Sequence, residues 1–414
     1  MIDQTLDMNN LEMSEKAKPL LAAVTKHIRE NVDPITEEFF RLGEGRADRW
    51  SYAPGQLELL DGAKQKAREA ETGEGLANLD YAYIAAELGK SPLAPETLNC
   101  SAPDTGNMEV LERVGTPEQK EQWLKPLLAG EIRSAFAMTE PDVASSDARN
   151  ISTSAVLDGD DWVINGEKFY ISGAGDPRCK IMIVMVKTSP EAETFRQQSQ
   201  ILVPMDTPGV EILGPMHVFG HDDAPHGHMH IRFTDVRVPR ENVLWGEGRG
   251  FEISQVRLGP GRIHHCMRSI GSAEKALDLM IERGLGREAF GKKIIDLGKN
   301  METISRARID IEAMRLMVLK AAKAMDVLGN KEARIWVSMI KALVPEKACE
   351  IIDASMQVHG ATGMSQWSPL SGMYTWQRAL RFADGPDEVH HQVIARAEVK
   401  AFQASNTRGS DGDS

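Results

Sequence analysis

A change of pattern along the chain constrains the fold more than any other feature of this sequence. Between residues 152 and 239, short apolar runs are separated by Asp-Gly, Asn-Gly and Pro-containing turns, which is typical of β-strands. Counted from its entrance near residue 133, this block of about 110 residues lies between two blocks whose apolar residues recur at helical spacing. The sequence therefore predicts an α+β protein in the order helices, strands, helices.

The helical blocks show where individual helices begin and end. Before the strands, the spacing predicts helices over 12–41, 78–90 and 115–131, the last of them with Thr116 as N-cap and Pro117 at its first position. After the strands, four long amphipathic stretches predict a helical bundle, with a kink at Pro345. The stretches are 251–283, 299–328, 331–359 and 372–402, and residues 98–107 have the composition of turns.

These patterns divide the chain into consecutive domains. We expect an N-terminal α-helical domain (1–133), a middle β domain (134–247), a C-terminal helical bundle (248–402) and a disordered tail (403–414).

Composition excludes some classes of function. The 48 Lys and Arg against 61 Asp and Glu give a formal net charge of −13, which disfavours nucleic acid or an anionic membrane as the main partner. The four cysteines are far apart and form no C-x-x-C pair, which indicates free thiols in a reducing compartment. No leader and no long apolar run is recognised, so we expect a soluble, cytoplasmic protein.

Four segments carry residues suited to chemistry, although each also has an ordinary structural interpretation. Residues 136–147 combine hydroxyls with a Thr-Glu-Pro turn that could bind a polar ring or a phosphate, or could be a plain connector. Residues 165–175 place an aromatic two residues before a Ser, as a ring-stacking strand or a hairpin would. Residues 286–294 could hold a phosphate or be a solvated basic turn. Residues 380–391 could carry a general base or be a charged turn.

Taken together and in this order, the segments resemble the acyl-CoA dehydrogenase family over nearly the whole chain. The matching motifs are MTEPDVASSD (138–147), NGEKFYIS (165–172), FTDVRVP with ENVL (233–239 and 241–244), REAFGK (287–292) and QVHGATG (357–363). The similarity is closest to the branch of family members ten and eleven, through NCSAPDTGN (99–107), GPGRIHH (259–265) and ADGPDE (383–388).

The resemblance implies a fold and a reaction. The fold would have a helical N-terminal domain, a β-barrel or sandwich in the middle and a C-terminal four-helix bundle. The reaction would be the FAD-dependent dehydrogenation of an acyl-CoA thioester to a trans-2-enoyl-CoA in fatty acid β-oxidation, with an electron-transfer flavoprotein as acceptor. The family resemblance also implies a homodimer or homotetramer, in which the segment 357–363 reaches a neighbouring subunit's FAD. Acyl chain length, branching and hydroxylation are not readable from the sequence.

The resemblance also assigns the FAD contacts residue by residue. Tyr170 stands where the family more often has Trp, and Ser172 stands where it has Thr. Ser146 would touch both FAD and the CoA arm, and Arg262 and Gly385 would lie at the substrate. The expected FAD-binding residues are Phe136, Ala137, Met138, Thr139, Ser145, Ser146, Tyr170, Ile171, Ser172, Arg287, Phe290, Gln357, Gly360, Ala361, Pro386 and Glu388.

The catalytic base of the family is usually a Glu in a Glu-Gly-Thr turn, and here Asp384-Gly385-Pro386 holds that place. Since Asp is one methylene shorter than Glu, its carboxylate falls short by roughly 1.5 Å unless the backbone lies closer or the acyl chain is held differently. We assign Asp384 as the base, with Asp387 and Glu388 as weaker candidates. Arg262 would either form a structural ion pair or act on the base electrostatically.

Other interpretations remain open at this stage. A flavin oxidase of the same fold, similar to nitroalkane oxidases, would also use an Asp base, and a non-catalytic DNA-binding flavoprotein is a second alternative. His226, His228 and His230 alternate and could bind a metal from one face of a strand, although surface or interface histidines fit better because no acidic or Cys ligand completes the set. We expect no metal.

Overall fold

A computed structural model describes residues 7–69 and 75–410, and it divides the chain into two compact units. The helical unit is formed from residues 1–33, 67–94 and 262–414, and the sheet unit from 34–66 and 95–261. Contacts therefore group the N-terminal helices with both units, whereas the sequence analysis treats them as one domain. The two units are described one after the other.

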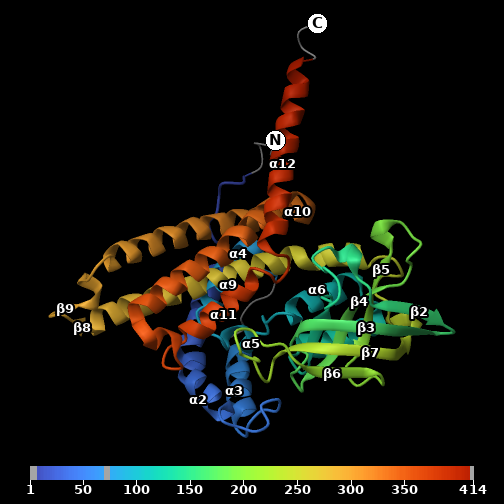
Figure 1. Ribbon diagram of the computed structural model, residues 1–414, viewed down its shortest axis with the longest axis horizontal. Helices are drawn as coiled ribbons and strands as arrows, with labels where there is room; N and C mark the ends of the chain where they lie inside the picture. Colours follow the sequence, from blue (N-terminus) through green and yellow to red (C-terminus); the bar gives the residue numbers. More distant parts are fainter. Residues whose placement is uncertain (1–6, 70–74, 411–414) are drawn as a thin grey trace. The chain divides into compact units, whose positions relative to one another are not determined.

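The sheet unit is built on a twisted seven-stranded sheet within the described residues (Figure 1). Its strand order is β1-β4-β2-β3-β7-β6, with β5 paired to β4. Most neighbours are antiparallel, but β1 and β2 both run parallel to β4. The strands are β1 (Arg133–Ala137), β2 (Ser154–Asp158), β3 (Asp161–Ser172), β4 (Cys179–Lys187), β5 (Gln198–Pro204), β6 (Val210–Pro215) and β7 (His228–Pro239).

One of the two expected turns near the start of the sheet is a bulge instead. The Asp-Gly pair at 158–159 does turn β2 into β3, as predicted. Asn165-Gly166 instead lies inside β3, where the register with β7 shifts. Gly166 has φ of 147°, and a Cβ there would come within 2.6 Å of Thr153 Oγ1, so only glycine fits. The bulge lets β3 continue to the aromatic and hydroxyl residues at its far end.

Helices cover the sheet within the same unit. Apolar residues of α6 (Asp104–Val114) and of the 117–128 helical segment pack on β4 and β5. The predicted cap of that segment is confirmed, because Thr116 and Gln119 form a reciprocal capping box. The prediction of a turn over 98–107 is wrong for its last residues, because α6 begins at Asp104. The Asp104 carboxylate accepts hydrogen bonds from Arg133 and Ser134 and does not close a turn.

Several short helices complete the first third of the chain. The helix predicted over 12–41 is present as α1 (Ala17–His27), a π-helical turn (Ile28–Val32) and α2 (Asp33–Gly43), and the helix predicted over 78–90 is α4 (Asn78–Leu88), followed by Gly89. The others are α3 (Gln56–Glu69), α5 (Ala94–Thr97), α7 (Pro117–Gln119), a π-helical turn (Lys120–Leu124) and α8 (Lys125–Leu128).

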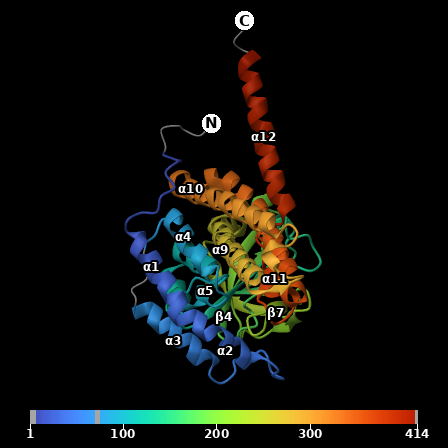
Figure 2. The ribbon, with the colours of Figure 1, turned by 90° about the vertical axis from the view of Figure 1, so that its left-hand side faces the viewer.

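The helical unit packs long helices around one apolar core. Its elements are the greater part of α9 (Gly250–Gly286), the small hairpin β8 (Glu288–Ala289) and β9 (Lys292–Lys293), α10 (Asn300–His359), α11 (Leu370–Leu380) and α12 (Asp387–Ser410). Figures 1 and 2 show α4 beside α9, and α12 extending beyond the other helices of this unit. The helical N-terminal part, the sheet and the bundle together confirm the predicted α+β fold.

The bundle differs from the sequence prediction at its helix ends. The non-helical residue within α10 is Gly329, with φ of 79°, whereas Pro345 lies inside the helical span and is buried. The stretch predicted as one helix over 372–402 is two, because residues 381–386 form a turn between α11 and α12. The structure continues α12 to Ser410, since no Pro interrupts the residues assigned to a tail from 403; residues 411–414 lie outside the described part.

Two glycines allow α4 and α9 to approach closely. A Cβ on Gly271 would lie 1.8 Å from the Ala86 carbonyl oxygen, and a Cβ on Gly89 would lie 1.9 Å from that of Arg268. Any side chain at either position would force the helices apart. This contact fixes the part of α9 that carries Arg262 and His265.

In the described part of the chain, no helix combines the length and hydrophobicity that a membrane span needs.

Candidate functional site

The turn between α11 and α12 carries the predicted base. Asp384 has φ of 57° and Gly385 has φ of 108°, so two consecutive residues adopt conformations that side chains disfavour. The Asp384 side chain is 17 % exposed. We call residues 381–386 the base turn. Its strained backbone presents the Asp384 carboxylate from a short, fixed loop.

Two cations, the buried Lys341 and the half-buried Arg262, hold the backbone of the base turn. Arg262 Nε on α9 donates to the Asp384 carbonyl oxygen over 2.8 Å. Lys341 Nζ on α10 donates to the Leu380 carbonyl and, over 3.4 Å, to that of Gly385. Burial lowers the pKa of Lys341 and, although Asp384 opposes it, also that of Arg262. Arg262 therefore contacts the main chain of Asp384, a third role beside the two that the sequence left open.

The Asp384 carboxylate faces a histidine. His265 Nε2 lies 3.5 Å from Asp384 Oδ2, and its other ring nitrogen, Nδ1, lies 3.3 Å from a guanidinium nitrogen of Arg268. Sequence reasoning gave His265 no role, although it stands within the motif 259–265. Its spacing of three residues from Arg262 was the available signal, since it places both side chains on one face of a helix.

The two alternative carboxylates near the base turn are placed differently. Asp387 is buried, and its Oδ2 accepts from Arg381 Nε over 2.6 Å, which makes it a partner of the turn's own arginine. Glu388 is exposed on the first turn of α12. His390, also on α12, is buried, and burial lowers its pKa to about 3. Its Nε2 atom packs against Gly385, where a Cβ would lie only 3.0 Å from it. These contacts favour Asp384 over Asp387 as the base.

In the sheet unit, a buried ion pair organises the segment predicted to meet the flavin. Glu140 Oε1 lies 2.8 Å from Lys168 Nζ, and Lys168 Nζ also donates to the Met138 carbonyl over 2.9 Å. The second oxygen, Oε2, accepts from the backbone N–H and the hydroxyl of Ser152, and Oε1 also accepts from the Thr153 N–H. We call this set the Glu140 cluster. It ties the loop after β1 to β3.

The two charges of the cluster shift each other's ionisation. Burial alone opposes the charge on Glu140, but Lys168 and the hydrogen bonds from Ser152 and Thr153 outweigh burial and lower its pKa to about 2. Burial lowers the pKa of Lys168 to about 8, although Glu140 opposes that change. Both residues stand in segments that resemble the family's motifs, but neither could be recognised as a buried pair from sequence, because burial is a property of the fold.

The predicted flavin contacts of the sheet unit fall into two groups. Thr139, Ser146 and Tyr170 are exposed, and Tyr170 has φ of 54° with 44 % of its surface accessible. Ser145 is buried, and its Oγ accepts from the Glu140 N–H over 2.8 Å. The others range from half-buried to buried on β1, the following loop and β3, and Ser172 Oγ lies 2.9 Å from His228 Nδ1; these others are Phe136, Ala137, Met138, Ile171 and Ser172.

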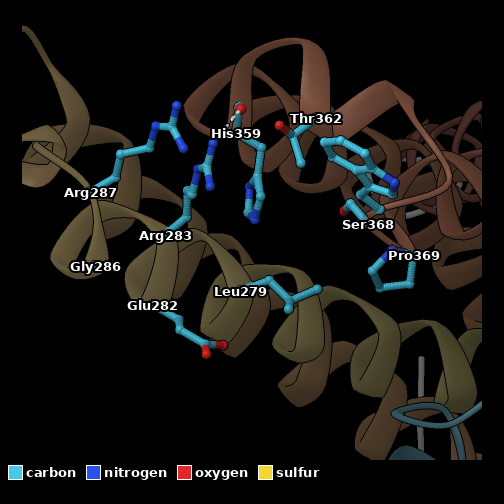
Figure 3. A pocket seen from close by; sticks show the side chains of 10 residues that line it. Leu279, Glu282, Arg283, Gly286, Arg287, His359, Thr362, Ser368 and Pro369 are labelled. Carbon is cyan, nitrogen blue, oxygen red and sulfur yellow. Dashed lines mark hydrogen bonds between the residues drawn. The ribbon is translucent and has the colours of Figure 1, made fainter. Parts of the chain in front are cut away.

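A separate pocket of about 390 Å³ lies in the helical unit (Figure 3). Arg283 on α9 and Arg287 just after it point towards the end of α10 at His359 and the following turn with Thr362, and Arg283 donates to the His359 carbonyl over 3.4 Å. Glu282 points away from these arginines. The pocket therefore presents two guanidinium groups, as a phosphate-bearing ligand requires. It is lined by Leu279, Glu282, Arg283, Gly286, Arg287, His359, Thr362, Trp367, Ser368 and Pro369.

The predicted adenine-side residues lie at and near this pocket. Arg287 lines it, and Gln357, Gly360 and Ala361 are exposed on the adjoining segment. Phe290, in the hairpin that follows α9, has φ of 52° and is 95 % exposed. Pro386 lies in the base turn, and Glu388 lies on the first turn of α12.

FAD fits these two sets of residues. The sheet unit offers an exposed ring and hydroxyls on a segment held by the Glu140 cluster. The helical unit offers a pocket with two guanidinium groups and, in the hairpin that follows α9, an exposed aromatic. A flat polar ring and a diphosphate need these two kinds of surface.

The histidines of β7 are engaged with neighbouring side chains. His228 bonds to Ser172, and His230 Nε2 lies 2.7 Å from Glu167 Oε2. Burial lowers the pKa of His226 to about 3 and also lowers that of His228, and both residues are half-buried. Within the described residues, no group of three possible ligands could hold a metal ion.

Comparison with known proteins matches the chain to the domains of acyl-CoA dehydrogenases. The N-terminal domain of that family matches residues 14–131, the middle domain 135–236 and the C-terminal domain 248–399. The structure resembles that of "a putative acyl-CoA dehydrogenase from Mycobacterium abscessus", with a TM-score of 0.91, 46 % identity and coverage of 94 % of this chain and 100 % of that one.

Relatives of known sequence show the same family at higher identity. The chain is 51 % identical to "Probable acyl-CoA dehydrogenase FadE2" of Mycobacterium tuberculosis, over 94 % of this chain and 96 % of that protein. It is 50 % identical to acyl-CoA dehydrogenase family member 10 of Mus musculus, over 94 % of this chain but only 37 % of that longer protein. For family member 11 of Gallus gallus the identity is 49 %, over 93 % of this chain and 51 % of that protein. The chain therefore belongs to the acyl-CoA dehydrogenase family, whose members are FAD-binding oxidoreductases.

Proposed function

We propose that this protein oxidises the Cα–Cβ bond of an acyl-CoA thioester to a trans-2-enoyl-CoA, with Asp384 as the base that removes the α-proton. The observation that carries the proposal is the base turn, in which the Asp384 carboxylate stands on a strained backbone held by Arg262 and Lys341. A base must be held within a fraction of an ångström to act efficiently, and a short side chain on a clamped backbone meets that need.

The chain's own residues would divide the work at the substrate. The Asp384 carboxylate would take the α-proton, and its affinity for that proton would rise as the acyl chain expels water. The Asp384 backbone N–H would donate to the thioester oxygen, where negative charge develops as the proton leaves. Arg262 would keep the peptide group after Asp384 in place, Gly385 would allow the acyl chain to approach the backbone, and Ser146 would contact the CoA arm.

FAD, when bound, would accept the hydride from Cβ. The exposed Thr139, Ser146 and Tyr170, with their neighbours on β1 and β3, would hold the ring end. Arg287, Phe290, Gln357, Gly360 and Ala361 of a second copy would hold the adenine end, so the protein would be a homodimer or a homotetramer. An electron-transfer flavoprotein would be the acceptor, and the pathway would be fatty acid β-oxidation in the cytoplasm.

Anaerobic mixing of the holoenzyme with saturated acyl-CoAs of short, medium and long chain tests the reaction. Loss of the oxidised flavin absorbance with at least one chain length is expected, and the length that reacts fastest defines the substrate class. No absorbance loss with any of them would contradict the dehydrogenase assignment. Oxygen consumption with nitroalkanes would then support the oxidase of the same fold instead, since both use an Asp base.

Substitutions near the base turn test the assignment of the base. Asp384→Asn keeps the size of the side chain, so FAD content should remain normal while flavin reduction slows by about 10²–10⁴-fold, the usual contribution of a general base. Glu398→Gln removes an exposed carboxylate further along α12, so it is the matched control and should reduce at nearly the wild-type rate. Wild-type reduction by Asp384→Asn would reject this residue as base.

The contribution of the pocket to cofactor binding needs its own measurement. Arg287→Gln removes a guanidinium group from the pocket and should lower the flavin retained after gel filtration. Glu282→Gln changes a residue that also lines the pocket but points away from the arginines, so its flavin content should be unchanged. Equal flavin content in both variants would contradict this placement of the adenine end.

A further inference from the structure

One polar side chain near the base has no part in the proposed proton transfer. His265 lies on α9 between Arg262 and Arg268, three residues from each, so the three side chains share one face of the helix. Arg262 holds the Asp384 carbonyl, His265 faces the Asp384 carboxylate, and Arg268 lies behind His265. The residues form a row that ends at the base.

The contact with Arg268 determines which nitrogen of His265 carries the hydrogen. A guanidinium group has only donors, so His265 Nδ1, 3.3 Å from it, must accept. The neutral ring then carries its hydrogen on Nε2, and this nitrogen lies 3.5 Å from Asp384 Oδ2. The ring therefore aims a donor at one oxygen of the carboxylate.

We propose that His265 is a positioning residue for Asp384, an inference that rests on the proposed function. The Nε2–H of His265 holds Asp384 Oδ2, and the carboxylate can no longer rotate about its Cβ–Cγ bond. Its other oxygen then keeps a single direction, in which it takes the α-proton. Arg268 keeps His265 in the required tautomer. This arrangement compensates for the shorter side chain of Asp. A carboxylate that is fixed in orientation on a fixed backbone is already aligned for proton transfer when the substrate binds.

Other charged groups surround the same carboxylate and contribute to its behaviour. Arg262 faces the base turn from α9, Lys341 from α10 and His390 from α12. His265 differs from these three because it contacts the carboxylate itself, whereas they lie against the backbone of the turn. Changes at His265 should therefore alter the orientation of the carboxylate without loosening the turn.

The test compares three replacements of His265 in the holoenzyme, with an acyl-CoA that reduces the wild-type flavin. His265→Gln places an amide nitrogen near the position of Nε2 and should reduce the flavin within about threefold of the wild-type rate. His265→Asn is too short to reach Oδ2, and His265→Leu has no donor; both should be slower by about 10–100-fold, as a misplaced catalytic group is. The KM for the acyl-CoA and the FAD content should stay unchanged. His391→Leu, an exposed histidine on α12, is the control.

The pH profile of flavin reduction separates a positioning role from a merely structural one. A donor to the ionised carboxylate favours that form, so losing it should move the acidic limb of the profile to higher pH in His265→Leu and His265→Asn, but not in His265→Gln. Equal rates and equal profiles for Gln and Asn would overturn the proposal, even if the Leu variant failed to fold. If no acyl-CoA reduced the wild-type flavin, the proposed function itself would fail before these variants were compared.

Discussion

Two fully buried lysines show how differently the two units use a positive charge. In the sheet unit, Lys168 is paired with Glu140, whose two oxygens accept further hydrogen bonds from Ser152 and Thr153. In the helical unit, Lys341 donates to the backbone carbonyls of Leu380 and Gly385 and forms no ion pair among the described residues. The charge of Lys168 is therefore neutralised by an adjacent carboxylate, whereas the charge of Lys341 is not.

The different surroundings of Lys168 and Lys341 indicate different roles for the two regions. A neutral, fully hydrogen-bonded pair holds a loop in place and leaves the flavin-facing residues to make the contacts. Around the base turn, Arg262 and Lys341 donate to backbone carbonyls, so they hold the main chain of the turn and do not neutralise a buried carboxylate. The Glu140 cluster should therefore matter mainly for folding, and the surroundings of Lys341 mainly for catalysis.

The largest expected effect is the loss of the paired charge. Glu140→Gln leaves Lys168 buried without a carboxylate and should lower the free energy of unfolding of the sheet unit by about 3–5 kcal/mol. Urea unfolding followed by tryptophan fluorescence measures it. Adding Lys168→Met should recover part of the loss, because both charges are then absent. If Glu140→Gln alone were as stable as the wild type, Lys168 would not depend on its paired carboxylate and the two lysines would not differ in this way.

Acid should affect the base turn before it affects the Glu140 cluster. His390 has a pKa of about 3 in the folded chain. Below about pH 6.5 this histidine therefore becomes protonated in the unfolded chain while it stays neutral in the folded chain. Stability from this group is present above about pH 6.5 and is lost as the pH falls, by about 1.4 kcal/mol per pH unit. The pKa of Glu140, about 2 when folded, makes its contribution fall only below about pH 4.3.

Substitution separates these two contributions to acid sensitivity. His390→Gln should flatten the decline of the unfolding free energy between about pH 6.5 and about pH 4.5, whereas Glu140→Gln should leave that slope unchanged. His264, whose folded pKa is also lowered to about 3 by burial, contributes to the slope with the same sign and remains in both variants. An unchanged slope in His390→Gln would show that this histidine is protonated equally in both states.

Removing the second lysine should cost less stability than breaking the pair. Lys341→Met leaves two carbonyls without a donor but also ends the burial of a charge, so we expect a loss of about 1–2 kcal/mol in the helical unit. Flavin reduction should slow more than this modest change in folding would explain. If the loss equalled that of Glu140→Gln with normal reduction, the charge of Lys341 would be structural.

The smallest expected effect concerns one hydrogen bond of the Glu140 cluster. Ser152→Ala removes the hydroxyl that donates to Glu140 Oε2 over 2.6 Å but keeps the backbone N–H that donates to the same oxygen. A loss of about 1 kcal/mol in unfolding free energy is expected. Ser189→Ala, whose hydroxyl bonds to Glu247 at an exposed position, is the matched control and should change little. A larger loss than in Glu140→Gln would show that the ion pair is not the main stabilising element of the cluster.

Backbone conformation links the sequence motifs to the site more closely than composition did. Tyr170, Phe290 and Asp384 were each selected from a different motif, and all three have positive φ, which only a few per cent of non-glycine residues adopt. Such strain persists only where the surroundings impose it, and it gathers at functional sites. The motifs located these residues, but their conformations are set by the bulged end of β3, the β8–β9 hairpin and the base turn.

Periodicity and turn residues determined the order of helices and strands and the cap at Thr116, because these depend on neighbours within a few positions. The segments assigned to the site came from motifs that resemble those of the family. Tertiary structure decided that Asn165-Gly166 is a bulge and that residues 381–386 break a predicted helix. It also decided that Lys168 finds a carboxylate, that Lys341 finds only carbonyls and that His265 faces Asp384. Each of these contacts depends on segments 28 to 119 residues apart meeting in space, and a side chain's burial and partners exist only once they have met.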